Sequence, residues 1–176
     1  MRVACFGGSF NPPHVGHAMV ASWCLWTDLV EEVWLIPAFV HAFEKSLVPF
    51  PQRFAACERL AALLGPRVRA IDVEARLPAP SFTIHTLDAL AAAHPGHTFR
   101  LLLGADAVPT LPKWRDWSRI EAEYAPIMVG RGDADVAGSP TFPNVSSTEV
   151  RRRVVAGEPV DALVPQGVLD AWLGKS

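Results

Sequence analysis

Two histidines near the N-terminus, His14 and His17, have the residue type and spacing needed to act together on a phosphate group. If the chain is helical from about Val15, side chains three positions apart share one face of that helix. Imidazole nitrogens donate hydrogen bonds to anionic oxygens. A helix N-terminus adds unpaired backbone N–H groups and a favourable dipole, so this stretch predicts an anion-binding site. The alternative is that each histidine is structural.

The residues before the histidines predict the backbone that would present them. Residues 2–6 form a short apolar run that is typical of a buried strand, and the glycine pair 7–8 follows it. We expect these glycines to form a tight turn in which the backbone can approach a ligand without a Cβ atom in the way. The prolines at 12–13 delay the helix. A glycine turn before a helix is common in α/β proteins, so it is weak evidence alone.

A second helix N-terminus is predicted at Ser146. Ser146 and Glu149 fit a capping box, in which the serine bonds the N3 amide and the glutamate reaches back to the cap residue. Ser147 and Thr148 add hydroxyl donors beside the free amides of this helix. These residues predict a second anion site.

Arg151 lies about one turn inside this second helix. A cation there is unfavourable against the helix dipole by about 0.3–1 kcal/mol, a cost that a bound anion would offset. Successive helical residues splay by about 100°, so the run 151–153 cannot direct all its side chains at one ligand. We expect one arginine to function and two to lie on the surface, against the alternative of a solvated basic face.

Composition limits the class of protein. The chain has 176 residues, of which 50% are hydrophobic and 19% charged, and its net charge is −2. This composition predicts a compact single domain over residues 1–176 and excludes a disordered tail. It implies no general affinity for nucleic acid, so an anion site must be local.

Location is predicted from what the sequence lacks. The cysteines Cys5, Cys24 and Cys57 are odd in number, lie in apolar contexts and form no C-x-x-C pair or metal-ligand cluster, which favours buried reduced thiols in the cytoplasm. No signal pattern precedes the first strand, and no apolar run is long enough to cross a membrane. We therefore expect a cytoplasmic protein without a membrane partner.

Strands and helices alternate along the rest of the chain. Strands are expected at 2–6, 32–36, 68–73, 98–103, 125–129 and 141–145, and helices at 15–27, 52–64, 84–93, 118–124, from 146 to about 157, and 162–173. This alternation predicts an α/β fold, a doubly wound (Rossmann-like) parallel sheet of five to six strands with helices on both faces. In such sheets ligands bind outside the carboxyl ends of the strands, where the strand order reverses.

Several local expectations follow. The long segment 38–51 comes after a strand, so we expect a functional loop at the ligand edge of the sheet. Residues 74–79 and 131–139 are predicted to be loops. Ser81 or Thr83 is expected to cap the helix at 84–93. Trp23 and Trp26 are interpreted as packing groups.

The full spacing G-G-S-F-N-P-P-H-x-G-H over residues 7–17 resembles the His-x-Gly-His signature of the nucleotidyltransferase superfamily, and its G-G-[ST]-F-[DN]-P form is most similar to nicotinate-nucleotide adenylyltransferases. Four further stretches resemble family motifs in the same order: P-S-F-T-x-x-T-L at 80–87, L-G-A-D at 103–106, L-P-K-W at 111–114 and V-S-S-T-E-V-R at 145–151. Asn11 stands where the family more often has aspartate, and either can hold a local turn by side-chain hydrogen bonds.

The resemblance implies adenylyl transfer from ATP to nicotinate mononucleotide, or to nicotinamide mononucleotide, in NAD biosynthesis. It implies catalytic roles for His14, His17 and Arg151, and Mg²⁺ held mainly by ATP and water rather than by the protein. It implies these ATP contacts: Gly7, Gly8, Ser9, Phe10, His14, His17, Gly104, Asp106, Ser146, Ser147, Thr148 and Arg151. It implies these contacts to the pyridine nucleotide: Ser9, Lys45, Thr83, Asp106 and Trp114, with Trp114 stacked on the pyridine ring.

Alternatives stay open at this point. A pantetheine-phosphate adenylyltransferase shares two of the motifs but does not explain the glycine pair or the Lys113-Trp114 segment. A nucleotide-binding regulatory module without catalysis is a second alternative. The loop at 38–51 departs from the family pattern, which leaves the choice between the acid and amide pyridine open. The oligomeric state is also open, a homo-oligomer included.

Overall fold

The computed structural model describes residues 1–40 and 47–175, and the description below concerns those residues. Six strands form a sheet in the order β3-β2-β1-β4-β5-β6, and every neighbouring pair is parallel. The strands are β1 (Arg2–Gly8), β2 (Glu32–Pro37), β3 (Val68–Ala70), β4 (Thr98–Gly104), β5 (Ile127–Arg131) and β6 (Thr141–Phe142). The doubly wound parallel sheet predicted from the sequence is confirmed.

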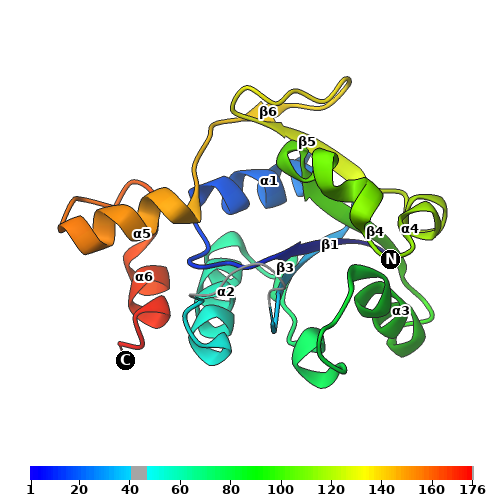
Figure 1. Cartoon of the computed structure of the whole chain (residues 1–176), viewed down its shortest axis with the longest axis horizontal. Helices are drawn as coiled ribbons and strands as arrows, with labels where there is room; N and C mark the ends of the chain where they lie inside the picture. Colours follow the sequence, from blue (N-terminus) through cyan, green and yellow to red (C-terminus); the bar gives the residue numbers. More distant parts are fainter. Residues whose placement is uncertain (41–46, 176) are drawn as a thin grey trace.

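Helices lie between successive strands as far as β5, and two more helices follow β6 (Figure 1). They are α1 (Val15–Trp26), α2 (Phe50–Leu64), α3 (Thr83–Ala93), α4 (Trp117–Tyr124), α5 (Ser147–Ala156) and α6 (Gln166–Trp172), with 3-10 helices η1 (Val73–Arg76) and η2 (Ala105–Lys113). Figure 1 shows α5 and α6, in orange and red, at one end of the molecule and α3 and α4, in green, at the other. The described part of the chain contains no helix with the length and apolar character needed to span a bilayer.

Helices cover both faces of the sheet, as expected. Apolar side chains of α1, α2 and α6 pack against one face together with Ala4, Val33 and Leu102. Side chains of α3 and α4 pack against the other face with Val3 and Cys5. Alternation of burial along β1 therefore places neighbouring residues in two separate cores.

The strand order reverses beside β1, whose neighbours are β2 on one side and β4 on the other. The carboxyl ends of β1 and β4 are Gly8 and Gly104, which were predicted to face the ligand. The crevice outside these two strand ends is the place where doubly wound sheets bind nucleotides.

Several strand predictions were wrong at their boundaries, and the sixth strand stops at Phe142 instead of Val145. The third strand stops at Ala70 instead of Val73, because the chain turns into η1, where the predicted loop of 74–79 begins. The fifth strand starts at Ile127, because Ala125 adopts a left-handed conformation (φ 31°) that ends α4 and delays the strand. The shift brings Arg131 into the strand end instead of a surface loop.

Three helix predictions also need correction. The final helix begins at Gln166 rather than 162, because Pro165 is its cap residue and a proline restricts the residue before it to extended backbone. Helix α2 begins at Phe50, so the predicted loop of 38–51 ends before it. Helix α3 is capped by Phe82 without a side-chain bond, not by Ser81 or Thr83.

The expectation about the cysteines is confirmed, whereas the expectation about the tryptophans of α1 is confirmed only for Trp23. Cys5, Cys24 and Cys57 are buried free thiols, as predicted, and burial raises the pKa of Cys24 to about 12. Trp26 was interpreted as a packing group, but it is 85% exposed on α1. Trp23 does pack, edge-on against Phe142.

Candidate active site

The glycine pair lies inside β1 rather than in a turn, which corrects the prediction. Gly7 and Gly8 pair with Ile36 and Pro37 of β2. The chain turns after them, where Phe10 has a left-handed backbone (φ 45°). A Cβ atom on Gly8 would lie 3.4 Å from the ring of Phe10, an ordinary van der Waals contact, so the ring itself does not require a glycine there.

Phe10 was predicted to contact ATP, and its side chain is 1% exposed within the core. Its ring packs against His17, with the ring centroids 4.7 Å apart. A contact between Phe10 and ATP can therefore come only from its backbone. Its side chain instead packs against the ring of His17.

His14 and His17 lie together at the start of α1, as their spacing predicts. Their ring centroids are 3.9 Å apart. The backbone N–H of His14, the cap residue of the helix, donates to Nδ1 of His17 at 3.1 Å. A neutral imidazole that accepts at Nδ1 carries its proton at Nε2, so His17 has a hydrogen-bond donor on its other nitrogen.

Both histidines are held in the neutral form. Burial, aided by the charge of Arg131, lowers the pKa of His14 to about 4. Burial also lowers the pKa of His17 well below its usual value, and the charge of Arg131, together with repulsion from any proton on His14, adds to this effect. At neutral pH the pair therefore offers neutral donors rather than two cations.

Gly16, between the two histidines, is required by the packing of His14. A Cβ atom at this position would lie 3.0 Å from both Cε1 and Nδ1 of the His14 ring. His14 itself is 4% exposed, so its ring has little room to move away. The small residue in the His-x-Gly-His spacing thus has a direct steric reason.

The N-terminus of α5 meets the loop before α1, as the sequence predicts for two helix starts at one sheet edge. The Ser147 hydroxyl donates to the carbonyl oxygen of Pro12 at 2.8 Å. Arg151 donates from Nη1 to the carbonyl oxygen of Asn11 at 2.7 Å and from Nη2 to the Thr148 hydroxyl at 3.3 Å. These contacts bring the two predicted anion sites together.

The neighbouring arginines point elsewhere. Arg152 pairs with Glu149 and Glu158, and Arg153 pairs with Glu149. The expectation that helical splay separates Arg151 from its neighbours is confirmed. Ser146 caps the helix by accepting from the Glu149 N–H at 3.1 Å. The second half of the capping box is wrong, because the Glu149 carboxylate binds the two arginines instead.

The same edge of the sheet includes residues at the carboxyl ends of β4 and β5. Asp106, one residue beyond the Ala105 that follows β4, forms an ion pair with Arg131 at 3.2 Å between Oδ2 and Nη1. Arg131 also donates from Nη2 to the carbonyl oxygen of Val145, just before α5, at 2.6 Å. A Cβ atom on Gly104 would collide with the Asp106 carboxylate. Arg131 thus joins three segments of the site, and sequence reasoning missed it because the fifth strand was placed two residues too early.

The predicted pyridine-nucleotide residues are spread over several elements. Thr83 is the first residue of α3, and Trp114 follows η2. The indole Nε1 of Trp114 donates to the Thr110 hydroxyl at 3.1 Å, and its ring packs edge-on against Trp117. Lys45 lies outside the residues that the structure describes.

A buried arginine that sequence reasoning missed supports this edge. Arg53 of α2 is 1% exposed and donates to the carbonyl oxygens of Ser9 and Val48, at 2.7 and 2.9 Å. It therefore connects the loop after β1 with the segment before α2. The signal in the sequence was an arginine on the apolar face of this helix, in line with Ala56, Cys57 and Leu60.

Asn11 forms long-range bonds instead of the local turn expected from its type. Its Oδ1 accepts from the Val48 N–H at 3.3 Å and from the indole Nε1 of Trp172 at 2.9 Å. With Arg151 on its carbonyl oxygen, Asn11 connects the loop to α5, to α6 and to the segment before α2.

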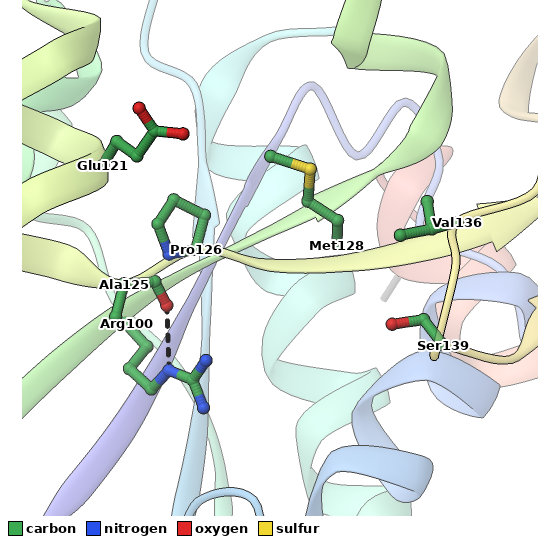
Figure 2. A pocket seen from close by; sticks show the side chains of 7 residues that line it. All are labelled: Arg100, Glu121, Ala125, Pro126, Met128, Val136 and Ser139. Atoms are coloured by element: carbon green, nitrogen blue, oxygen red, sulfur yellow. Dashed lines mark hydrogen bonds between the residues drawn. The ribbon is translucent and has the colours of Figure 1, made fainter.

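A separate depression of about 400 Å³ lies away from these residues (Figure 2). Arg100, Glu121 and Met128 are among its lining residues, and Arg100 donates from Nε to the Ala125 carbonyl oxygen at 2.9 Å. Its lining includes none of the predicted site residues. Across residues 1–40 and 47–175, no cluster of three or more His, Cys, Asp or Glu side chains has an arrangement suited to a metal ion.

Comparison with known proteins gives consistent results. Residues 5–153 match the model of the family described as cytidylyltransferase-like. A probable nicotinate-nucleotide adenylyltransferase of Anaeromyxobacter sp. (strain K) is 48% identical over 172 residues, which cover 96% of this chain and 91% of that protein. A relative of the same description from Myxococcus xanthus is 36% identical and covers 94% and 88% of the two chains.

Solved structures share the fold. The nicotinic acid mononucleotide adenylyltransferase of Plasmodium falciparum, solved in complex with NaAD, is similar with a TM-score of 0.78. It is 18% identical, and the match covers 98% of this chain and 95% of that one. A putative nicotinate-nucleotide adenylyltransferase from Vibrio parahaemolyticus has a TM-score of 0.70 at 20% identity, with 98% and 92% covered.

Proposed function

This chain belongs to the cytidylyltransferase-like family, among its nicotinate-nucleotide adenylyltransferases, and we propose that it transfers the adenylyl group of ATP to nicotinate mononucleotide. An oxygen of the mononucleotide 5′-phosphate attacks the α-phosphorus of ATP. The bond from that phosphorus to the oxygen bridging the β-phosphate breaks, and pyrophosphate leaves. The product is the dinucleotide that precedes NAD in its biosynthesis.

The observation that carries this proposal is the meeting of α1 and α5 at the switch point of the sheet. Arg151 and Ser147 of α5 bind the carbonyl oxygens of Asn11 and Pro12, directly before the histidine pair. Helix N-termini, neutral imidazole donors and a guanidinium then face one crevice. Such a set suits a triphosphate and the charge that develops as it reacts.

The roles follow from the geometry. The Nε2–H of His17 is the donor for a phosphoryl oxygen, since its Nδ1 already accepts from His14. Arg151 supplies positive charge that is delocalised over a planar group and binds phosphate oxygens in pairs. The attacking phosphate is already ionised, so the reaction needs alignment and charge stabilisation rather than a general base.

Mg²⁺ enters with ATP, as part of the substrate. Magnesium is commonly held by substrate phosphates and waters with few protein ligands, which suits this donor set. The contribution of the protein is then to hold the remaining phosphate oxygens with the α1 and α5 residues.

The pyridine nucleotide occupies the other half of the crevice in this proposal. Asp106 binds a ribose hydroxyl after leaving its ion pair with Arg131, which is exposed enough to exchange partners. Trp114 stacks on the pyridine ring, and Thr83 at the start of α3 contacts the nucleotide. Lys45 is also proposed to contact the nucleotide, on the basis of the sequence resemblance alone.

The experiment is product analysis with three acceptors. Purified protein is incubated with ATP, Mg²⁺ and nicotinate mononucleotide, nicotinamide mononucleotide or phosphopantetheine, and pyrophosphate and adenylated product are measured, with acceptor omitted as the control. We expect the nicotinate dinucleotide to form fastest. Product from phosphopantetheine alone would select the pantetheine-phosphate adenylyltransferase, and ATP binding without any product would select a regulatory module.

A further inference from the structure

Glu74 lies in η1, in a segment predicted to be a plain loop, and its carboxylate accepts three hydrogen bonds from separate parts of the chain. Oε2 accepts from the backbone N–H of Phe39 at 3.1 Å and from the Ser81 hydroxyl at 3.0 Å. Oε1 accepts from the Thr86 hydroxyl at 3.2 Å. The donors lie 35, 7 and 12 residues from Glu74 in the sequence.

Each donor belongs to the half of the crevice proposed for the pyridine nucleotide. Phe39 follows the end of β2 and begins the segment predicted to be the substrate loop. Ser81 and Thr86 flank Thr83, the α3 residue proposed to contact the nucleotide. Thr86 is 4% exposed, so its bond to Glu74 fixes the first turn of the helix from inside.

The same segment also contacts the residue that follows the proposed stacking residue. The guanidinium of Arg115 lies over the Phe82 ring, 4.8 Å from its centroid. Arg115 directly follows Trp114. Ser81 thus forms a hydrogen bond with Glu74, and the neighbouring Phe82 contacts the residue that follows Trp114.

A carboxylate is the group that these three donors require. One backbone N–H and two hydroxyls all donate to it, and an ionised carboxylate is an acceptor at both oxygens. An amide of the same shape keeps one acceptor oxygen and turns its NH₂ group toward the donors of the other, so at least one of the three hydrogen bonds is lost.

We propose that Glu74 is a positioning residue for the pyridine-nucleotide half of the site. It acts through Phe39, Ser81 and Thr86, and it sets where Thr83 and the start of the 38–51 segment lie. The inference rests on the proposed function, because it assigns those segments to the nucleotide acceptor. The ATP half is built from other contacts, those of α5 with residues 11–12 before the histidine pair.

The test is a comparison of Michaelis constants for the two substrates in Glu74→Gln. A small misplacement of binding groups is costly, so we expect the KM for nicotinate mononucleotide to rise about tenfold or more. The KM for ATP is expected to stay within about twofold, since none of the donors belongs to the proposed ATP site. Ser81→Ala and Thr86→Val each remove one donor, keep the carboxylate, and are expected to reproduce part of the same selective rise.

The matched control is Asp72→Asn. Asp72 is two residues away, carries the same charge, and pairs with the exposed Arg76 instead of the three donors. Its loss is expected to leave both Michaelis constants unchanged. Melting temperatures of all variants are measured alongside.

Failure of the Glu74 inference and failure of the proposed function give different results. Equal rises in both constants, or a lowered melting temperature with unchanged constants, would make Glu74 a general stabiliser and overturn the inference. A wild-type protein that forms no dinucleotide from either pyridine mononucleotide would instead overturn the proposed function, and the inference with it, before any variant is measured.

Discussion

The backbone N–H of His14 donates to Nδ1 of His17 at 3.1 Å, while the two imidazole rings lie 3.9 Å apart between centroids. This contact fixes the tautomer of His17 and leaves Nε2–H as its free donor direction. The bond also opposes protonation of His17, since Nδ1 can accept a hydrogen bond only while it carries no proton. One hydrogen bond therefore joins the cap residue of α1 to the histidine that we propose as a phosphate donor.

The lowered histidine pKa values predict a stability that depends on pH. His14 titrates at about 4 in the folded chain and near 6.5 when unfolded, so between these values the unfolded state binds more protons. The contribution of His14 is complete above about pH 6.5 and is lost as the pH falls toward 4. At about 1.4 kcal/mol per pKa unit, the loss is on the order of 3 kcal/mol. Urea unfolding at pH 7.5 and 5 should detect about 2 kcal/mol of this loss, because pH 5 lies about 1.5 units below the unfolded pKa. His14→Gln should flatten the profile; an equally steep profile in that variant would contradict the assignment.

Gly16→Ala is expected to disturb the histidine pair. The added Cβ atom would lie 3.0 Å from the buried His14 ring, and overpacking of this kind costs about 1–3 kcal/mol. Turnover should fall as well, because the ring must shift. Gly167→Ala in α6 is the control, since nothing lies within 4 Å of its added Cβ atom. Unchanged stability and turnover in Gly16→Ala would show that the ring has more room than the structure gives it.

Arg151→Ala is expected to impair the use of ATP far more than Arg153→Ala. Arg151 reaches the loop before α1, whereas Arg153 is held by Glu149. Losing a charged hydrogen-bond donor costs about 1.5–3 kcal/mol, or more than tenfold in kcat/KM for ATP. Steady-state kinetics at varied ATP concentration measure both variants. Equal losses would indicate a diffuse basic surface.

Trp114→Ala is expected to weaken the pyridine nucleotide and leave ATP binding nearly unchanged. Stacking of an aromatic side chain on a base is worth about 1–3 kcal/mol, so affinity should fall roughly tenfold or more. Trp114→Phe should recover part of the loss. Calorimetric titration with each nucleotide, together with the melting temperature, measures the effect. Loss of both affinities with a large drop in melting temperature would place Trp114 in the packing against Trp117 instead.

The sequence predicted most of the sheet because its pattern is local. The apolar run at β1, the prolines before α1 and the left-handed Gly157 after α5 each act within a few residues. The expected position of the site, at the carboxyl ends of the strands, followed from the alternation of strands and helices. The histidine pair and Arg151 could also be placed, because helical spacing fixes their neighbours.

The missed residues depend on distant partners. Glu74 contacts a backbone group 35 residues away, and Arg53 contacts one 44 residues away. Nothing near Glu74 in the sequence distinguishes it from an ordinary loop acid, and the position of Arg53 on the apolar face of α2 does not identify its distant partners. Arg131 was missed for another reason: the left-handed Ala125 delays β5 by two residues, and propensity does not report such a helix end.

The most direct test of the site is the turnover of His17→Ala, with His85→Ala on the exposed side of α3 as a control. Removing a preorganised donor to developing charge costs on the order of 10²–10³ in kcat. We expect that loss in dinucleotide formation, with KM for ATP and the melting temperature close to wild type, and no loss in the control. An unchanged kcat with a raised KM for ATP would contradict the role assigned to His17 in the transfer step.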